Sequence, residues 1–397
     1  MKILIVHNYH RNGSASGDDQ VFKNECQALK EKGIIVYTYS VINDEFDRAG
    51  ILGKIVSCIN MFWSKKTYKK LDDIIKREHP EIMHVHTFFP LISPSVFKVG
   101  KDNGIKVVQT IHDTRYICPN ASSLRNGHIC NDCITGHYMR MCRYKCFKGS
   151  RIQSFIVALI FSVHRKCRTF YKYIDRYICL NKEQMELMKK AGFDEKKLLL
   201  KYNFVERTEI GEIATEVVLP ERYVVFYGRI GEEKGIQFLC DVWKNMDIPI
   251  VLMGDGPLKE RVLDCQKQNP KNIIYLGYVP HKQCSAIVSK SEFVVMPSIW
   301  YEGCSMVIVE SFALGKPVIA TNLGFMKEAV QNGKNGYTFE LGNKKEFIQA
   351  VNNLWNHSQK LKEMREYIVQ DFSEKYEKEK NIEQLIQIYG ECYGSKY

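Results

Sequence analysis

The 397-residue sequence contains no long hydrophobic run, which argues against a membrane-spanning helix. Its longest apolar stretch, residues 155–163, is far shorter than the roughly 20 residues that a helix needs to cross a bilayer. The apolar run within the first ten residues is too short and too soon interrupted to act as a signal peptide. We therefore expect a soluble protein of the cytoplasm.

Several sequence patterns are missing as well. There is no internal repeat and no low-complexity segment, which argues against a solenoid or a disordered chain. The glycine pattern G-x-G-x-x-G, the dinucleotide-binding fingerprint, does not occur. A hydrophobic content of 45% and an aromatic content of 12% are typical of a globular protein, and the length allows two domains with separate cores.

Cysteine is abundant, with 14 residues, although no export signal is present. Such cysteines are expected to be thiols or metal ligands rather than disulfides. Cys130 and Cys133 form a C-x2-C knuckle in a polar segment, and Cys118 and Cys146 would complete a four-thiolate site for a structural zinc ion. Free thiols in a loop are the alternative. Further candidate ligands in the same segment are Cys142, His128 and His137.

Positive charge is concentrated in the first half of the chain. The formal net charge is +12, of which residues 1–200 carry +14 and the remainder −2. An anionic partner, either nucleic acid or a membrane surface, is expected to meet that half. Residues 51–77 and 151–172 each combine an apolar helical face with basic ends. Ordinary core helices account for this composition, and peripheral attachment to anionic lipid is the alternative.

The order of predicted elements indicates an α/β fold. Residues 2–6, 20–32 and 34–38 read as a β-strand, an α-helix and a second strand, which is a βαβ unit. Several more strands follow in the first half of the chain. The polar residues 206–220 are expected to form a linker. A new α/β series begins after the linker. The further predicted strands are 82–86, 106–110, 173–180, 223–227, 249–253, 272–276, 294–296 and 318–320.

The stretch from 294 to 320 reads as a strand, a loop, a helix and another strand, with Glu302 in the loop and Glu310 in the helix. Met306, Val309, Phe312 and Ala313 are expected to share one helix face. The two glutamates stand roughly 12 Å apart along the chain axis at about 1.5 Å per residue, too far to share a proton as a hydrolytic pair. This spacing suits a long ligand that is held at two points with a phosphate between them.

Charged and polar residues follow other strands at the positions where α/β sheets bind ligands. Arg229 and Lys234 flank a tight turn before a helix, where two cations and backbone N–H groups can hold a diphosphate. His112 follows the strand at 106–110, and an imidazole there can donate to a sugar hydroxyl or a phosphate.

The motifs around these residues are specific enough to indicate a family. They are Gly228-Arg229, Glu233-Lys234-Gly235, Gly254-Asp255-Gly256-Pro257, the E-x7-E pair Glu302 and Glu310, Gly315-Lys316-Pro317-Val318-Ile319-Ala320, and Gly333 with Gly336. Together they resemble the family 4 retaining glycosyltransferases over essentially the whole chain, most specifically over residues 223–340. Thr110-Ile111-His112-Asp113, Cys118-Pro119, the C-x2-C knuckle, and Cys146 through Gly149-Ser150 resemble a branch found in bacterial surface-polysaccharide pathways.

The resemblance implies the GT-B fold, in which two Rossmann-like, doubly wound parallel-sheet domains face each other across a cleft. It places an acceptor-binding domain at 1–205, with a cysteine-rich insert at 117–150, and a nucleotide-sugar-binding domain at 206–375. The C-terminal helix, 376–397, is expected to return to the first domain.

The resemblance also implies roles for individual residues. Glu310 would bind the donor ribose, Arg229 and Lys234 would neutralise the diphosphate, Glu302 would orient the donor sugar, and His112 would reach the sugar and phosphate. Where the family usually has Gly-Gly in the first loop, this chain has Ser16-Gly17-Asp18-Asp19. The expected catalytic residues are His112, Glu302, Arg229 and Lys234. The expected donor-binding residues are Gly17, Gly228, Arg229, Lys234, Gly254, Tyr278, Glu302, Gly303, Cys304, Ser305, Met306, Val307 and Glu310.

The implied activity is transfer of a hexose-type sugar, with retention, from a UDP- or GDP-sugar to a saccharide acceptor, lipid-linked on the inner membrane face, in capsule, exopolysaccharide or O-antigen synthesis. No Asp-x-Asp occurs, so no catalytic metal cofactor is expected. No nucleic-acid partner is expected either. The alternatives are another GT-B enzyme, such as a sugar-nucleotide epimerase, or a zinc-containing nucleic-acid-binding protein. The latter leaves the Glu302/Glu310 and Arg229/Lys234 pairs unexplained.

Overall fold

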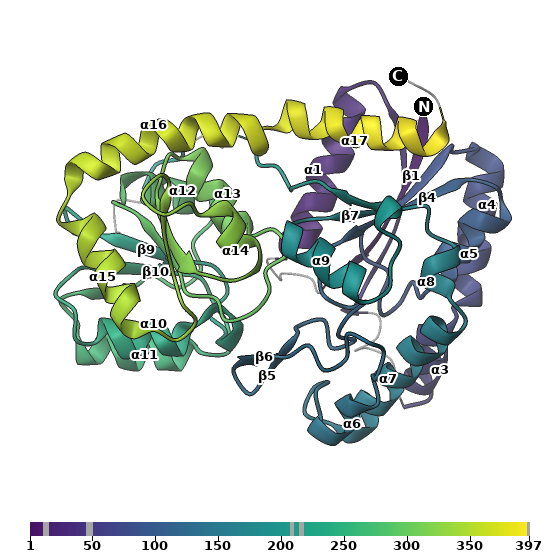
Figure 1. The fold of residues 1–397 in the computed structure, drawn as a ribbon, viewed down its shortest axis with the longest axis horizontal. Helices are drawn as coiled ribbons and strands as arrows, with labels where there is room; N and C mark the ends of the chain where they lie inside the picture. Colours follow the sequence, from purple (N-terminus) through teal and green to yellow (C-terminus); the bar gives the residue numbers. More distant parts are fainter. Residues whose placement is uncertain (11–15, 45–50, 207–209, 214–217, 395–397) are drawn as a thin grey trace. The chain divides into compact units, whose positions relative to one another are not determined.

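The computed structural model describes residues 1–10, 16–44, 51–206, 210–213 and 218–394, without the side chains of 51–55. The chain forms two compact units (Figure 1). The first unit comprises Met1–Ser123, Cys130–Asn203 and the C-terminal segment from Glu379. The second unit comprises Leu124–Ile129 and Phe204–Lys378. The expectation that the first unit binds the acceptor and the second unit binds the donor stays a prediction.

The first unit is built on a six-stranded parallel sheet. Ile3, Leu4, Ile5 and Val6 are completely buried, as in strands that are covered on both faces. The chain places β1 between β2 and β3, and each later strand adds to the far side of β3. The strand order is β2 (Ile35–Ile42), β1 (Lys2–Tyr9), β3 (Ile82–Val85), β4 (Lys106–Ile111), β7 (Arg176–Cys179) and β8 (Leu198–Leu200).

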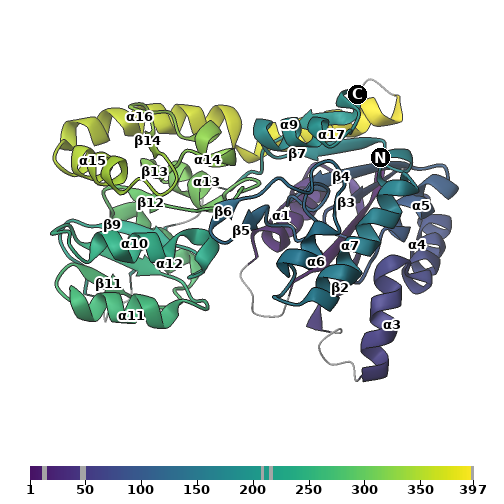
Figure 2. The same ribbon diagram turned by 60° about the horizontal axis from the view of Figure 1, so that its bottom comes forward.

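Helices connect these strands, as parallel pairing requires, and the C-terminal helix joins the unit from the end of the chain. They are α1 (Gly17–Glu31), α3 (Ile51–Phe62), α4 (Lys65–Glu78), α5 (Ser95–Asp102), α6 (Arg140–Tyr144), α7 (Arg151–Lys166), α8 (Thr169–Lys172), α9 (Lys182–Lys190), η1 (Glu195–Lys197) and α17 (Lys378–Tyr393). Helices α3 and α7 lie beside each other (Figure 2), and His164 Nε2 donates to the carbonyl oxygen of Phe62 at 2.9 Å.

The C-terminal helix α17 belongs to the first unit, as expected. The hydroxyl of Tyr389 lies 2.7 Å from Nδ1 of His84, and the side-chain amide of Asn381 donates to the carbonyl oxygen of Tyr202 at 2.6 Å. A salt bridge of 3.5 Å from Lys32 to Glu383 joins the helix to the residue that follows α1. These contacts fix α17 to elements from both ends of the first unit's sequence.

The second unit repeats the same architecture. Its six parallel strands are ordered β11 (Ile273–Tyr275), β10 (Ile250–Met253), β9 (Val224–Tyr227), β12 (Val294–Met296), β13 (Val318–Thr321) and β14 (Gly336–Phe339). The helices are α10 (Ile236–Trp243), α11 (Lys259–Gln268), α12 (His281–Lys290), α13 (Met306–Ala313), α14 (Gly324–Ala329), α15 (Lys344–Trp355) and α16 (Ser358–Lys375), with a 3₁₀ turn η2 (Glu232–Lys234). The expected α/β class with two parallel sheets is therefore confirmed.

The structure adds one element that was not predicted and corrects part of one predicted helix face. A two-stranded antiparallel hairpin, β5 (Leu124–Arg125) with β6 (His128–Ile129), was not foreseen in the cysteine-rich segment. Helix α13 also turns a different face inward: Met306 and Ala313 stay partly exposed, while the buried residues are Ile308, Val309, Ser311 and Phe312. The physical reason is that buried Ser311 bonds to the carbonyl oxygen of Val307 and contacts the hydroxyl of Tyr227.

In the described part of the chain, no helix combines the length and the apolar character that crossing a membrane requires.

Candidate functional site

The second sheet reverses its strand order between β9 and β12. From β9 the chain proceeds through β10 to β11 on one side, and then returns to β12 and continues to β14 on the other. Open α/β sheets bind ligands at such a switch point, beyond the carboxyl ends of the strands. The loops after β9 and β12 meet there, because the Ile299 N–H donates to the carbonyl oxygen of Glu233 at 2.9 Å.

Glu302 is the most strongly fixed charged group at this switch point. Three donors converge on its Oε1: Lys234 Nζ at 2.6 Å, Trp300 Nε1 at 2.7 Å and Ser298 Oγ at 3.0 Å. The Glu302 side chain is only 9% exposed and that of Lys234 is 19% exposed. The carboxylate therefore has one defined orientation, and Lys234 is held beside it as a partly buried cation.

Arg229 contributes a second, more exposed cation after β9. Its guanidinium lies 3.6 Å from the carboxylate of Glu233, and its side chain is 65% exposed. Exposed pairs of this kind contribute little stability, so Arg229 can leave Glu233 for a ligand at small cost. Arg229 and Lys234 belong to the same short loop, which ends where α10 begins.

Glycines let the strand ends approach one another closely. An added Cβ on Gly254 would lie 1.8 Å from the carbonyl oxygen of Gly228, so no larger residue fits between the ends of β9 and β10. Tyr278 follows the edge strand β11, which β10 and β9 separate from β12, and it is 70% exposed. The structure thus brings Gly228, Gly254 and the loop of Arg229 together, and it leaves Tyr278 exposed beyond the edge strand.

The loop after β12 leads into the N-terminus of α13. Ser305 is the N-cap residue, and its hydroxyl contacts the sulfur of Met296 at 3.0 Å instead of capping the helix. The first backbone N–H groups of a helix have no partner within the helix, and the helix dipole makes this end attractive to anions. Gly303, Cys304, Ser305, Met306 and Val307, all expected donor-binding residues, line this turn.

Glu310 lies one turn further along α13. It contacts His281 Nε2 at 3.4 Å, and this hydrogen bond raises the pKa of His281 although burial opposes the shift. Tyr227, at the end of β9, donates its hydroxyl proton to the carbonyl oxygen of Val307 at 2.8 Å. Burial, followed by the Glu310 charge, holds the pKa of Tyr227 well above its ordinary value. Sequence reasoning overlooked His281 because no motif marks it.

In the first unit, His112 lies beyond the carboxyl end of β4, as the sequence predicts, and it joins a buried cluster. Its Nε2 lies 3.0 Å from Nδ1 of His86, and its Nδ1 lies 3.6 Å from Oδ1 of Asp18. Gly17 is the first residue of α1, immediately before Asp18. Burial lowers the pKa of His112 to about 4, against the opposing charge of Asp18, so the imidazole is neutral near pH 7.

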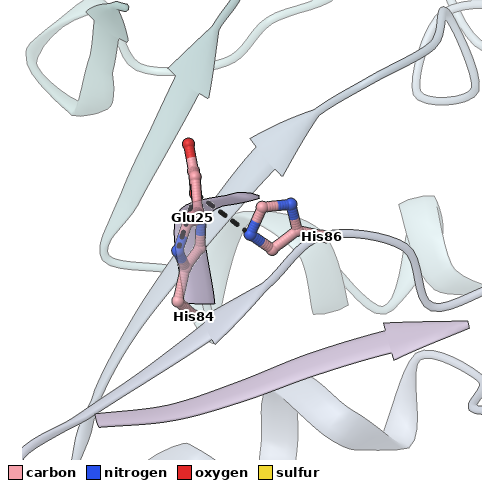
Figure 3. A group of neighbouring side chains, drawn as sticks. All are labelled: Glu25, His84 and His86. Carbon is pink, nitrogen blue, oxygen red and sulfur yellow. Dashed lines mark ion pairs between the residues drawn. The ribbon is translucent and has the colours of Figure 1, made fainter. Parts of the chain in front are cut away.

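Behind His112 lies a group that sequence reasoning missed, Glu25 with His84 and His86 (Figure 3). Glu25 is completely enclosed, and its Oε1 pairs with Lys201 Nζ at 2.7 Å, with both side chains 1% exposed. Burial alone would raise the pKa of the Glu25 carboxyl, but Lys201 and His86 hold it well below its ordinary value. A buried Glu and a buried Lys, 176 residues apart, carry no sequence signal that relates them.

Glu25, His84 and His86 have ligand atoms within 4.8 Å of one another, which raises the question of a metal site. His84 does not fit this role, since Nδ1 contacts the Tyr389 hydroxyl at 2.7 Å and Nε2 contacts the Thr110 hydroxyl at 2.8 Å. A divalent ion on Glu25 would also lie roughly 5 Å from the Lys201 ammonium. At an effective dielectric constant of about 20, that repulsion is about 7 kcal/mol. We therefore interpret the group as a hydrogen-bonded network.

The four cysteines of the predicted zinc site lie in one neighbourhood, because charges on Cys118, Cys130 and Cys146 each act on the Cys133 thiol. Backbone N–H groups of Ser123, Asn120 and Ser122 are directed at the sulfur of Cys118. Within the described residues, however, no three of these sulfur atoms lie within 4.8 Å of one another. The sulfurs of a tetrahedral zinc site, at about 2.3 Å from the ion, lie closer than that. The zinc site stays a prediction.

Comparisons with known proteins agree with this geometry. The family model described as Glycosyl transferases group 1 matches residues 213–371. An uncharacterized glycosyltransferase of Methanocaldococcus jannaschii is 31% identical over 245 residues, or 59% of this chain and 66% of that protein. An uncharacterized 41.2 kDa protein in the cps region of Klebsiella pneumoniae is 29% identical over 212 residues, or 50% and 56% of the two chains. The matches therefore span less than two thirds of either relative.

A solved structure extends the likeness to the whole chain. The crystal structure of Anabaena Alr3699/HepE in complex with UDP covers 98% of this chain and 100% of that chain, with a TM-score of 0.70 and 16% sequence identity. Two parallel-sheet units of this kind define the GT-B fold, which this protein adopts. The match to the group 1 glycosyltransferases covers residues 213–371, which lie within the second unit.

Proposed function

We propose that this protein is a retaining glycosyltransferase that moves a hexose-type sugar from a nucleotide-diphosphate sugar to a saccharide acceptor. The observation that carries the proposal is the Lys234–Glu302 pair at the switch point of the second sheet, directly before the N-terminus of α13. It combines a fixed cation, a fixed carboxylate and backbone donors, which are the groups that a sugar diphosphate requires.

Each part of the donor has a counterpart in the second unit. Arg229 and Lys234 neutralise the diphosphate, together with the backbone N–H groups from Gly303 to Val307. Glu302 accepts hydrogen bonds from sugar hydroxyls, and Glu310 accepts them from the ribose. Two protein cations and a helix dipole supply fixed electrostatic stabilisation of the leaving group, so the reaction needs no divalent metal.

The proposed reaction proceeds on one face of the sugar. The bond from the anomeric carbon to the phosphate oxygen breaks, and its electron pair leaves with the nucleoside diphosphate. The acceptor oxygen forms its bond to the same carbon from the same face, and its proton passes to the departing phosphate oxygen. Arg229 and Lys234 act on the negative charge that develops on this phosphate.

The donor base is testable directly. HepE was crystallised with UDP, and we propose a UDP- or GDP-sugar for this chain. A thermal-shift screen against UDP-, GDP- and ADP-sugars is expected to raise the melting temperature with one nucleotide series, because a ligand that binds the folded state stabilises it. NMR of the product is expected to show a retained anomeric configuration. No shift with any sugar nucleotide, or an inverted product, overturns the proposal.

Measuring donor consumption with and without acceptor distinguishes a glycosyltransferase from a sugar-nucleotide epimerase. A sugar-nucleotide epimerase of this fold would convert or hydrolyse the donor without an acceptor. We expect the donor to be consumed in proportion to acceptor added. Acceptor-independent conversion to an epimeric sugar would favour the alternative.

For the acceptor we propose a lipid-linked saccharide at an anionic membrane surface, in polysaccharide synthesis. This is supported by the cps-region relative and by exposed apolar side chains on α3 and α7. Exposed basic residues lie next to these helices in the chain. The exposed apolar residues are Val56, Ile59, Ile152, Phe155 and Val163, and the basic ones are Lys65, Lys66, Arg143, Lys145, Lys148, Lys166 and Arg168.

Vesicle sedimentation tests this surface. The protein is expected to bind vesicles that contain phosphatidylglycerol, and binding should weaken with salt because lipid charge contributes. The I152S/F155S variant is expected to lose at least tenfold in binding. Val369→Ser, a substitution of a comparably exposed apolar residue on α16, serves as the matched control. Equal binding by both variants would contradict the proposal.

A further inference from the structure

A chain of polar contacts links Glu25 to His112 through the interior of the first unit. Glu25 Oε2 lies 3.2 Å from His86 Nε2, and His86 Nδ1 lies 3.0 Å from His112 Nε2. Glu25 Oε2 and His86 Nε2 are fully buried, and neither makes a well-aligned hydrogen bond among the residues that the structure describes, so the 3.2 Å contact between them is the polar contact within reach of both. A single proton shared between these two atoms would satisfy both of them, in line with the effect of His86 on the Glu25 carboxyl.

The direction of each hydrogen bond follows from proton counting. An ionised Glu25 accepts only, so His86 must carry its proton on Nε2. Lys201 already neutralises Glu25, and among the described residues no second carboxylate forms an ion pair with His86 to balance a positive charge there. A neutral imidazole has one N–H, which leaves Nδ1 of His86 as an acceptor. His112 must then donate to it from Nε2.

We infer that Glu25, acting through His86, is a positioning residue that holds His112 in the Nε2–H tautomer. In this tautomer Nδ1 of His112 is an acceptor, and it lies beside the carboxylate of Asp18 at the carboxyl end of the sheet. Two acceptors side by side receive hydroxyl donors and repel phosphate oxygens. The inference rests on the proposed function and refines it: His112 contacts a hydroxyl of the sugar rather than the diphosphate.

Lys201 is also required to hold His112 in the Nε2–H tautomer. Without it, the buried Glu25 would take up a proton and become a donor or an acceptor, and it would no longer impose a direction on His86. His84 supports the arrangement from the other side, because both of its nitrogens are occupied by the hydroxyls of Tyr389 and Thr110. It therefore does not compete for Glu25, from which its Nδ1 lies 4.0 Å away.

The tautomer of His112 is the decisive measurement, and it does not depend on activity. With ¹⁵N-labelled histidine, long-range ¹H–¹⁵N correlation spectra distinguish Nδ1–H, Nε2–H and imidazolium forms. The His112 signals are assigned by their absence in His112→Gln. At pH 7 we expect the Nε2–H form for both His86 and His112. An Nδ1–H form or an imidazolium at His112 in the unsubstituted protein overturns the inference.

Substitution tests whether Glu25 sets the tautomer. Glutamine offers either a donor or an acceptor and so imposes no direction, and the E25Q/K201M variant removes both buried charges together. In this variant the Nδ1–H form of His112 is expected to rise from under about a tenth to about half of the population. Tyr138→Phe, which removes a buried hydroxyl that donates to the carbonyl oxygen of Tyr116 in the same unit, is the control and should leave the His112 tautomer unchanged. An unchanged tautomer in E25Q/K201M overturns the inference.

Binding measurements connect the tautomer to the ligand. E25Q/K201M is expected to weaken binding of the sugar nucleotide about tenfold, as for loss of one hydrogen bond, and to leave the free nucleotide diphosphate within twofold. Equal weakening of both ligands would show a phosphate contact and would contradict the inference. If no sugar nucleotide binds the unsubstituted protein, the proposed function fails while the tautomer measurement still stands.

Discussion

Gly235 lies directly against Pro297: a Cβ added to the glycine would lie 1.9 Å from the proline carbonyl oxygen. Gly235 also has a φ of 72°, in the left-handed region that side chains rarely adopt. This contact holds the loop that carries Arg229 and Lys234 against the loop that carries Glu302. The position of Arg229 and Lys234 relative to Glu302 thus depends on the lack of a side chain at Gly235.

Gly235→Ala is therefore expected to destabilise the second unit by about 3 kcal/mol or more, since it combines a backbone clash with left-handed strain. The comparison is Gly277→Ala, where φ is 67° but nothing lies within 4 Å of an added Cβ. Strain alone should then cost about 1 kcal/mol. Hydrogen exchange of peptides around β9 and β12 measures both effects. Equal protection in the two variants would show that the contact does not matter.

Arg229→Ala and Lys234→Ala are each expected to lower turnover by roughly 10²–10³-fold, in line with loss of one group that stabilises transition-state charge. Lys267→Ala is a matched control, because Lys267 is 77% exposed and pairs only with a surface aspartate among the described residues. The measurement is kcat with saturating donor. Near-normal rates in both variants would refute the role assigned to these cations.

Buried histidines are expected to make the first unit sensitive to acid. Burial lowers the pKa of His7, His84, His112 and His164 in the folded protein. Below about pH 6.5 the unfolded chain binds protons that the folded unit does not, so stability falls as pH falls, by about 1.4 kcal/mol per pH unit for each such group.

The acid effect can be assigned to one residue outside the proposed site. His164→Gln is expected to flatten the pH dependence of hydrogen exchange in α7 between pH 7 and pH 5. His357→Gln, on the surface before α16, is the control. Identical pH dependence in the unsubstituted protein and in His164→Gln would contradict the explanation.

The cysteine-rich segment is predicted to bind one zinc ion per chain. Cys118→Ser, Cys130→Ser, Cys133→Ser and Cys146→Ser should each abolish zinc binding, as measured by elemental analysis, while Cys142→Ser should retain it. Cys142 lies in the same segment but outside the predicted four-thiolate set. Substitution with Co²⁺ should give the visible absorption of a tetrahedral thiolate site. Purified protein without zinc, or equal loss in Cys142→Ser, would refute this prediction.

The outcome for helix α13 shows why some predictions needed correction. Its beginning and end followed from Gly315, Pro317 and the apolar pattern, but the pattern does not reveal that Ser311 faces inward. Ser311 can be buried because its hydroxyl bonds to the carbonyl oxygen of Val307 and contacts the hydroxyl of Tyr227 on strand β9. A prediction from hydrophobic periodicity alone treats serine as polar and places it on the solvent-exposed face of the helix.

The sequence by itself determined the α/β class, the strands with their carboxyl-end residues, and the motifs around Arg229, Lys234, Glu302 and Glu310. These features are local: an apolar run, a glycine or a charged residue is visible within a few positions. Only the tertiary structure decided that Glu302 takes three donors on one oxygen, and that Glu25, His86, His112 and Lys201 share one buried network. Such contacts join strands and helices far apart in the chain, and a buried charge is stable only where its distant partner reaches it.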